Sequence, residues 1–372
     1  MHAQPAPATP PPAPDVLVFT NGDRLVGQFV RSTGASVTFK SDMLGEITVD
    51  WAKIKELHSA QQFAVVEKGV RLGKHEDASK IPQGAVTMTD QKLEVRPKEG
   101  QAPQTIPVTE SAYVIEENTF QRAVMHQAGW REAWAGSITG GASLVEATQH
   151  SRTFTGAISL VRALPTEAWL DRRNRTMIDF NASYGTLSQP GVPDLKTEIY
   201  HLGLERDEYF TPRVFAFGQM TLDHNFSQGL SLQQTYGGGI GWTAIKNDNE
   251  ELDLKASLTY VGQRFITDAL PGLPPGFVIS PYANQQLFGS TFGETYNRKF
   301  ARGILFNQQL SVTPAWNNLQ AYSGLASASL LMPVYKRFSV NLGTSDTFLN
   351  NPPPGFRKWS LQFIMGLTYT LP

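Results

Sequence analysis

The sequence of 372 residues contains no cysteine. This absence excludes disulfides, thiolate metal sites and cysteine nucleophiles, and it is compatible with an envelope protein that avoids stray oxidation. Charged residues are also scarce: they make up 17% of the chain, whereas about 25% is usual for a soluble protein. The net charge of −1 and the pI near 6.7 give no indication of nucleic-acid binding. We therefore expect no nucleic acid among the partners.

Long hydrophobic runs are missing as well. No run reaches the roughly 18 apolar residues of a membrane-spanning helix, so no such helix is predicted. Hydrophobic residues form 41% of the chain, and the mean hydropathy is −0.25. Glycine is abundant, with 32 residues. This composition favours strands in which apolar side chains alternate with polar, mostly uncharged ones.

The last stretch, residues 357–372, shows this alternation over its whole length. Because side chains alternate between the two faces of a strand, its apolar and polar sets lie on opposite faces. A strand that faces lipid needs such an apolar wall, whereas the core-facing strand of a large soluble barrel is the alternative. The residues expected to face lipid are Trp359, Leu361, Phe363, Met365, Leu367, Tyr369 and Leu371. Ile364 interrupts the polar set.

The same period of two continues from residue 132 onward. It predicts strands at 132–147, 151–163, 174–188, 194–207, 212–225, 230–245, 250–266, 284–299, 302–314, 319–331, 336–346 and 357–371. Most exceed the roughly 9–11 residues that a tilted membrane strand needs, and globular strands average only about 5–6. The predicted fold class is all-β, with a C-terminal antiparallel transmembrane β-barrel of about 12 strands and a small N-terminal β domain before it.

The barrel interior should be lined by Ser, Thr, Gln and Asn with few charges. The residues expected to face this lumen are Gln233, Thr235, Gly239, Gln309, Ser311, Gln362, Gly366 and Thr368. An even strand count returns the C-terminus to the side of the N-terminal domain, which we expect to be the periplasm. The short turns then lie in the periplasm, and the long loops 267–283 and 347–356 lie outside. Segment 164–173 does not fit, because it is too long for a periplasmic turn.

The N-terminal part divides by composition. Residues 1–14 are rich in proline and predict a disordered linker. They contain no signal-peptide core, and the start resembles the end of a cleavage site, so we expect a longer precursor or a mature form. Residues 15–116 predict a small periplasmic β domain, 117–130 a connector helix capped by Asn118, and 131–372 the barrel.

Within 15–116, short β-rich runs are separated by turn signals such as Asn21-Gly22. Strands are expected at 15–19, 24–31, 36–40, 45–49, 54–58, 63–67, 84–88, 92–96, 105–108 and 112–116. The first five resemble a small Sm-like or SH3-like barrel. Residues 63–115 form either a second module or an extension of the first.

Several stretches of the barrel carry a resemblance to a known family. They are W-A-G-S-I-T-G-G-A-S at 134–143, R-D-E-Y at 206–209 with F-A-F-G after it, G-G-G-I-G-W at 237–242 and G-L-T-Y at 366–369. Over roughly 132–372 the chain resembles the YdiY-like, salt-induced outer-membrane protein family, a domain family of unknown function. The resemblance implies an outer-membrane barrel and no particular activity. The N-terminal N-G-D-R-L-V-G segment looks like the periplasmic extension of some members.

The C-terminal end also resembles the signal read by the barrel-assembly machinery, through Gly366, Tyr369 and Leu371. It departs from that signal at Ile364 and at Pro372, which replaces a terminal aromatic residue. The expected partners are therefore outer-membrane lipids, the barrel-assembly machinery, and a periplasmic protein or cell-wall component bound through 15–116. Trp134, Trp242, Tyr260, Trp359 and Tyr369 are expected as aromatic anchors at the membrane interfaces.

Candidate chemistry is sparse. Asp223, His224 and Ser227 group a nucleophile, a base and an orienting acid, and twelve-stranded outer-membrane phospholipases exist. Neighbouring strand residues point to opposite faces, however, so Asp223 and His224 cannot cooperate within a strand. A polar loop is the favoured interpretation.

No cofactor or metal is expected. The pattern Gly239-Ile-Gly241-Trp-Thr-Ala244 matches a dinucleotide fingerprint, but it lies inside a strand and not at a strand–helix turn. The acidic turn at 248–253 lacks the glycine and spacing of an EF-hand, and the 7 histidines form no H-x-x-x-H pair. A pore and a structural or envelope-stress protein remain as functions. An enzyme of phospholipase type is disfavoured, and a soluble barrel that binds a ligand is the further alternative.

Overall fold

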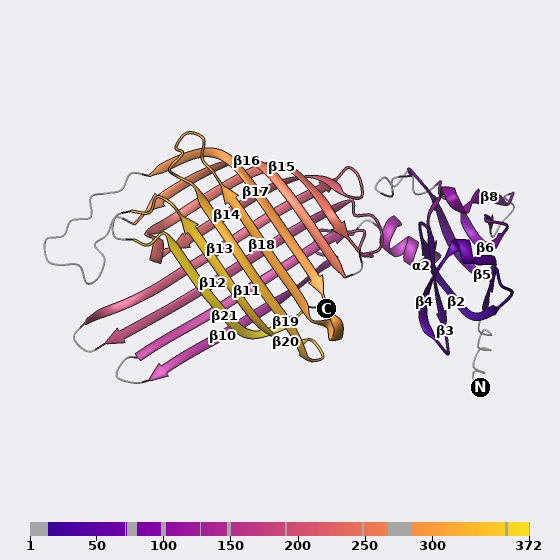
Figure 1. The fold of residues 1–372 in the computed structure, drawn as a ribbon, viewed down its shortest axis with the longest axis horizontal. Helices are drawn as coiled ribbons and strands as arrows, with labels where there is room; N and C mark the ends of the chain where they lie inside the picture. The colour runs from indigo at the N-terminus through magenta and orange to yellow at the C-terminus, as the bar shows by residue number, and fades with distance from the viewer. Residues whose placement is uncertain are drawn as a thin grey trace, which may run out of the picture. The chain divides into compact units, whose positions relative to one another are not determined.

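The computed structural model describes residues 14–70, 72, 80–97, 102–126, 128–146, 150–189, 192–247, 249–266, 284–353 and 356–371. The chain forms two compact units, residues 1–129 and 130–372 (Figure 1). Nearly all of the expected proline-rich linker and all of the expected loop 267–283 lie outside the described residues. No helix in the described part of the chain is long and apolar enough to cross a membrane.

The first unit is one antiparallel nine-stranded sheet. Its path runs β4-β3-β2-β1-β5-β6-β7-β8, and β9 pairs with both β2 and β5. The strands are β1 Asp15–Phe19, β2 Arg24–Thr33, β3 Ser36–Ser41, β4 Gly45–Asp50, β5 Ile54–Glu67, β6 Gln83–Thr89, β7 Lys92–Arg96, β8 Gln104–Pro107 and β9 Ser111–Glu116. Two expected strands, 54–58 and 63–67, are the two ends of β5.

One hydrophobic core joins all parts of this sheet. Phe29 from β2 packs on Phe63 from β5 with ring centroids 4.6 Å apart, and both belong to one buried cluster with Met88 and Val95 from β6 and β7. The indole N–H of Trp51 donates to Ser32 Oγ at 2.9 Å, which satisfies the polar end of a buried ring. Because one core spans early and late strands, residues 63–115 extend the first module and do not form a second one. The five-stranded barrel expected for 15–58 is thus part of a larger sheet.

A short helix closes the first unit. α2 spans Glu117–Phe120 and continues as a wider turn, η3, over Gln121–Met125, so it is shorter than the expected 117–130. Phe120 is fully buried. The cap is Glu116, not Asn118: its carboxylate accepts from the backbone N–H groups of Asn118 at 3.2 Å and Thr119 at 3.0 Å. Burial opposes its charge, but these hydrogen bonds prevail and hold the pKa of Glu116 below its usual range.

We expect Glu116→Ala to destabilise the first unit by about 1 kcal/mol at neutral pH, the usual cost of a lost helix cap. Because the folded-state pKa is lowered, this stabilisation is present above the unfolded pKa and is lost as pH falls through the folded one. Amide hydrogen exchange of strands β1 to β9, followed in the full chain, would measure the difference. Asn118→Ala removes only a side-chain amide that donates to the same carboxylate at 2.6 Å, so it should cost less than Glu116→Ala. A cost that stays unchanged well below pH 4 would contradict the capping role.

The second unit is a closed barrel in which each strand pairs with the next, β10 to β21. The strands are β10 Trp134–Glu146, β11 His150–Leu164, β12 Asn174–Gln189, β13 Val192–Tyr209, β14 Val214–Asn225, β15 Leu230–Lys246, β16 Glu250–Phe265, β17 Gln285–Lys299, β18 Leu305–Thr313, β19 Ser323–Tyr335, β20 Phe338–Leu349 and β21 Trp359–Thr370. The antiparallel strands are tilted relative to the barrel axis (Figure 1). The predicted fold class and strand count are confirmed.

The ring closes between the first and last strands. Ser137–Gly140 of β10 pairs with Leu367–Thr370 of β21. The hydroxyls of Thr139 and Thr368 lie 2.7 Å apart and buried at this seam. A methyl at Gly366 would stand only 2.6 Å from the carbonyl oxygen of Gly140, so the seam needs a residue without a side chain there.

Candidate functional site in the barrel interior

The inward face of the barrel is defined by contacts that cross the lumen. Arg175 on β12 donates to Asp253 Oδ2 at 2.7 Å and to Glu251 Oε1 at 3.0 Å, both on β16. Three strands lie between β12 and β16, so these side chains meet only through the interior. Arg175, Glu251 and Asp253 therefore point inward.

The pairing register carries this assignment around the ring, because directly paired residues share a face. Arg175 pairs with Asp207, Asp207 with Phe217, and Phe217 with Gly239. The same steps lead on through β16 and β17 to Gln309 and Ser311, and through β19 and β20 to β21. All eight residues named for the lumen lie on this inward face: Gln233, Thr235, Gly239, Gln309, Ser311, Gln362, Gly366 and Thr368. Ile364 shares it.

The opposite face of β21 is exposed over its whole length. Trp359, Leu361, Phe363, Met365, Leu367 and Tyr369 are between 36% and 78% exposed, whereas Ser360 and Thr368 between them are buried. Leu371 follows the end of the strand. The six exposed side chains are apolar and point away from the lumen, so they need a partner other than water.

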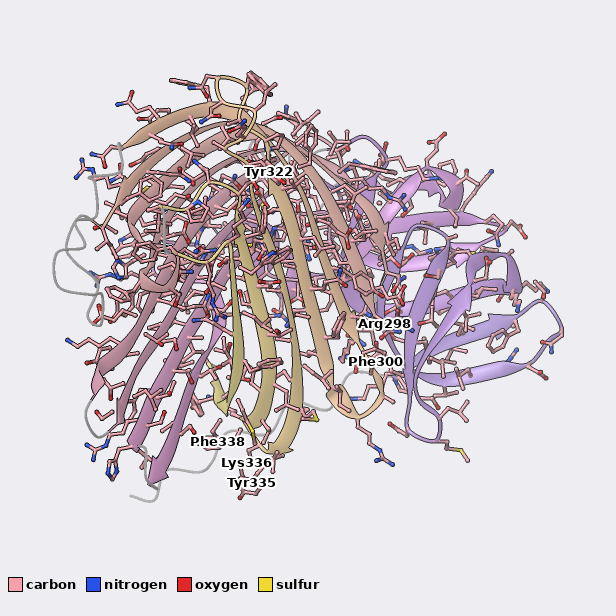
Figure 2. All side chains as sticks on the ribbon, turned by 60° about the vertical axis from the view of Figure 1, so that its left-hand side comes forward. Arg298, Phe300, Tyr322, Tyr335, Lys336 and Phe338 are labelled. Carbon is pink, nitrogen blue, oxygen red and sulfur yellow. The ribbon has the colours of Figure 1, made fainter. Side chains whose placement is uncertain are left out.

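Aromatic rings gather at two levels of the outward face. Near one end, Phe348 packs between Tyr322 and Trp359, with centroid distances of 5.5 and 4.5 Å. Near the other end, Phe338 lies 5.3 Å from Tyr369. Figure 2 shows Tyr322 far from Phe338 along the barrel. Of the other expected anchors, Trp242 is 50% exposed, and Tyr260 lies 5.1 Å from Phe288. Trp134 donates to the carbonyl of Trp130 at 2.7 Å.

A buried ion-pair network centres on Arg175 at the end where the short turns lie. Arg175 donates to Asp207 at 2.7 Å in addition to Asp253 and Glu251. The side chains of Arg175, Asp207 and Asp253 are 7%, 0% and 1% exposed. Thr243 also donates to Asp253 at 2.7 Å. Each inner carboxylate thus has a charged hydrogen-bond donor, the condition under which buried charges are tolerated.

The long segment between β11 and β12 completes this network. Arg172 donates to Glu251 at 2.6 Å, and Asp171 lies 3.6 Å from the Lys246 ammonium on β15. Leu170 is fully buried. Segment 164–173 was expected to be a periplasmic turn of unsuitable length. The structure explains its length, since the segment bridges the barrel end to β15 and β16 instead of turning back at once.

The other end of the barrel is bridged as well. Gln228, in the turn between β14 and β15, is buried and donates to the carbonyls of Thr347 at 3.0 Å and Lys358 at 2.8 Å. Thr347 lies near the end of β20, and Lys358 directly precedes β21. Strands β20 and β21 lie across the ring from β14 and β15. Leu230, Phe265 and Leu349 form a buried apolar cluster nearby. Side chains therefore span the lumen at both ends.

A histidine sits between two inward carboxylates farther along the lumen. His201 Nε2 lies 2.8 Å from Asp179 Oδ2, and His201 Nδ1 lies 2.5 Å from Asp223 Oδ1. Asp223 is thus paired with His201 and not with its neighbour His224, whose Nδ1 lies 2.8 Å from the Ser231 carbonyl on the outward side. The structure does not bring Asp223 and His224 together as a catalytic pair. In the described residues no three His, Asp or Glu side chains are grouped to hold a metal ion.

The expectation of a lumen with few charges is wrong. Lys255 pairs with Glu205 in the interior, in addition to the Arg175 network and His201. The sequence did not reveal these residues because each occupies an ordinary polar position of an alternating strand, and only the fold brings together the partners from different strands. The R-D-E-Y motif was the available signal, since its Asp207 and Tyr209 point inward.

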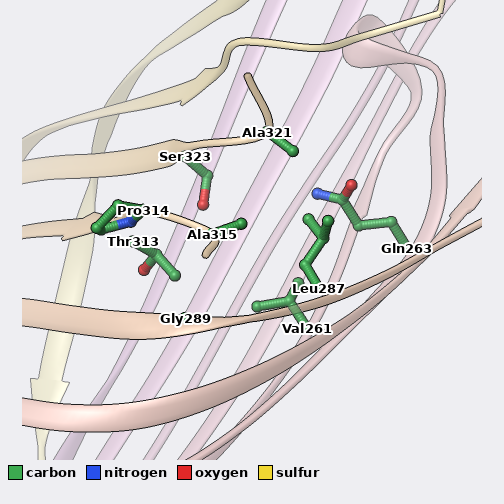
Figure 3. Close-up of a pocket in the computed structure, with 9 residues that line it drawn as sticks. All are labelled: Val261, Gln263, Leu287, Gly289, Thr313, Pro314, Ala315, Ala321 and Ser323. Atoms are coloured by element: carbon green, nitrogen blue, oxygen red, sulfur yellow. The ribbon is translucent and has the colours of Figure 1, made fainter. Parts of the chain in front are cut away.

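A small pocket lies on the inward face of the barrel, formed by β16, β17, β18, the segment after β18 and the start of β19 (Figure 3). It is lined by Val261, Gln263, Leu287, Gly289, Thr313, Pro314, Ala315, Ala321 and Ser323. No ionisable side chain is among them. The pocket therefore lacks an acid, a base or a charged anchor for a ligand.

Residues 140–371 match a family model described as a protein of unknown function, DUF481. The chain belongs to this family. The match covers the barrel from within β10 onward and leaves the nine-stranded sheet outside it. No curated protein matches this DUF481 chain.

Among solved structures, the chain is similar to the NanC porin at 10% identity, with a TM-score of 0.33, covering 63% of this chain and 96% of that one. It is similar to the translocator domain of the autotransporter NalP from Neisseria meningitidis at 9% identity, with a TM-score of 0.32 and coverage of 63% and 87%. The transport unit of the autotransporter AIDA-I from Escherichia coli has 13% identity, a TM-score of 0.31 and coverage of 68% and 96%.

Proposed function

We propose that this DUF481 protein is an outer-membrane β-barrel that anchors its N-terminal β domain in the periplasm and does not act as an open pore or as an enzyme. The barrel would hold the first unit, 1–129, at the membrane, where that unit binds a periplasmic protein or cell-wall component. The observation that carries the proposal is the bridging of the lumen at both ends by Arg175 and Gln228 and their partners.

The outward surface supports a membrane location. Its exposed apolar strip on β21 and its two aromatic levels are the features by which a barrel wall meets hydrocarbon and headgroups. In water, so large an apolar surface would lead to aggregation. A barrel also leaves no unpaired backbone groups at strand edges, which lipid requires.

The short turns and both ends of the barrel domain's chain lie on one side. Trp134 begins β10 and Thr370 ends β21 at the end that carries the turns after β13, β15, β17 and β19. In bacterial barrels the short turns face the periplasm. This orientation would put the first unit in the periplasm.

The location is tested by fractionating cells that express the full chain. We expect the protein in the outer-membrane fraction and a different gel mobility before and after boiling, because a closed barrel resists detergent. Protease added to intact cells should spare the first unit. Recovery in the soluble fraction without detergent would end the membrane proposal.

A selective pore is the second candidate, favoured by the charged residues of the lumen. We expect the full chain in a planar bilayer to show no steady conductance, because ion pairs and hydrogen bonds cross both ends. Replacing Arg172 and Arg175 with glutamine removes the ion pairs that cross the short-turn end, and it should raise the conductance only in combination with Gln228→Ala. A matched variant that replaces Lys336 and Arg337 with glutamine serves as the control. Steady conductance of the unmodified protein would favour the pore.

A further inference from the structure

Cations and aromatic rings gather on two adjacent turns at the short-turn end. We define this cationic rim as Arg298, Lys299, Phe300, Arg302, Tyr335, Lys336, Arg337 and Phe338. It covers the turn between β17 and β18 and the turn between β19 and β20. The two turns adjoin, since a methyl at Gly303 in the first would stand 3.6 Å from Pro333 Cγ before the second.

The positive charge of the rim is largely uncompensated. Arg298 pairs with Glu250 at 3.1 Å. In the described part of the chain, no carboxylate pairs with Lys299, Arg302 or Lys336. All three are exposed. Elsewhere at this end the charges are balanced more closely, as for Arg206, which lies 2.6 Å from Glu208.

The aromatic rings of the rim are exposed, and two of them lie against rim cations. Phe300, Tyr335 and Phe338 are 42%, 63% and 41% exposed. The Arg298 guanidinium lies 5.0 Å from the centre of the Phe300 ring, and the Lys336 ammonium 5.1 Å from that of Tyr335. Figure 2 shows the labelled rim residues at one end of the barrel, away from Tyr322. In a membrane, exposed aromatic rings at a barrel end insert among the lipid headgroups, and neighbouring cations then stand at the level of the phosphates.

We propose that the cationic rim binds the phosphate headgroups of anionic phospholipids in the leaflet at the short-turn end. Lysine and arginine donate to phosphate oxygens, and clustered cations beside a membrane-spanning segment attract anionic lipids. The proposal rests on the membrane location proposed above and adds the lipid class. It concerns phospholipid, not the phosphates of lipid A in the opposite leaflet.

The test uses the full chain, folded into detergent and examined by native mass spectrometry with added phosphatidylglycerol, phosphatidylcholine or lipid A. We expect retention of phosphatidylglycerol in preference to phosphatidylcholine. The Lys299→Gln, Arg302→Gln, Lys336→Gln triple variant should bind phosphatidylglycerol roughly 10- to 100-fold more weakly, because each cation near a membrane surface contributes several-fold. Arg24→Gln, Lys40→Gln, Lys55→Gln removes the same charge from the first unit and should leave binding unchanged.

Three results would overturn the inference: no preference of the unmodified protein for phosphatidylglycerol, an equal loss in the control variant, or a preference for lipid A. Gel mobility before and after boiling checks that each variant is folded. Insertion of the full chain into lipid vesicles separates this inference from the proposed function. If the membrane proposal fails, the protein does not insert into vesicles at all, whereas if only the lipid inference fails, it inserts equally well into phosphatidylglycerol and phosphatidylcholine vesicles.

Discussion

Arg175→Leu is expected to destabilise the barrel by about 3–5 kcal/mol, the cost of breaking a buried ion pair by removing one partner. The substitution leaves the carboxylates of Asp207 and Asp253 without their guanidinium, and these two groups are 0% and 1% exposed. Both must then lose their charge, admit water or separate. Urea unfolding of the protein in lipid vesicles would measure the loss.

Two further variants make this prediction specific. Arg206→Leu removes an arginine from the outward side, where its pair with Glu208 is about half exposed, and should cost less than about 1 kcal/mol. Adding Asp207→Asn to Arg175→Leu removes one stranded charge and should restore part of the stability. Equal costs at Arg175 and Arg206 would show that the inner network does not hold the barrel end together.

The second large effect concerns the two faces of β21. Met365→Arg places a charge on the outward face near the middle of the strand, where the side chain is 72% exposed. In a bilayer an arginine at the midplane costs roughly 2–4 kcal/mol, so assembly or stability should fail. Gln362→Arg places the same side chain on the inward face, and we expect it to fold with a much smaller cost.

These two substitutions test which face of β21 each side chain occupies. They do not test whether the barrel lies in a membrane, because a soluble barrel could also tolerate Gln362→Arg. A spin label at Phe363 or Met365 adds that information. We expect its signal to relax with a lipid-soluble reagent and not with a water-soluble one. The opposite result would contradict both the face assignment and the location in a bilayer.

The path of the chain was largely predictable from the sequence. Alternation with period two depends only on residues near each other in sequence, so all twelve long strands were found, with ends within about four residues. In the first unit, Asn21-Gly22 and similar turn signals marked where one strand ends and the next begins. The break between the expected strands 54–58 and 63–67 was wrong, because polar residues within a long bent strand such as β5 resemble a turn.

What the sequence determined by itself is the fold class, the strand order and the two faces of each strand, since all three follow from local periodicity. Which residues meet across the lumen was decided only by the tertiary structure. Arg175 and Gln228 find their partners across the lumen 76 to 130 positions away in the chain, through the register of several strands in succession. A shift of one residue in any of those pairings would turn these side chains to the other face, so no local pattern could have shown that both ends of the barrel are bridged.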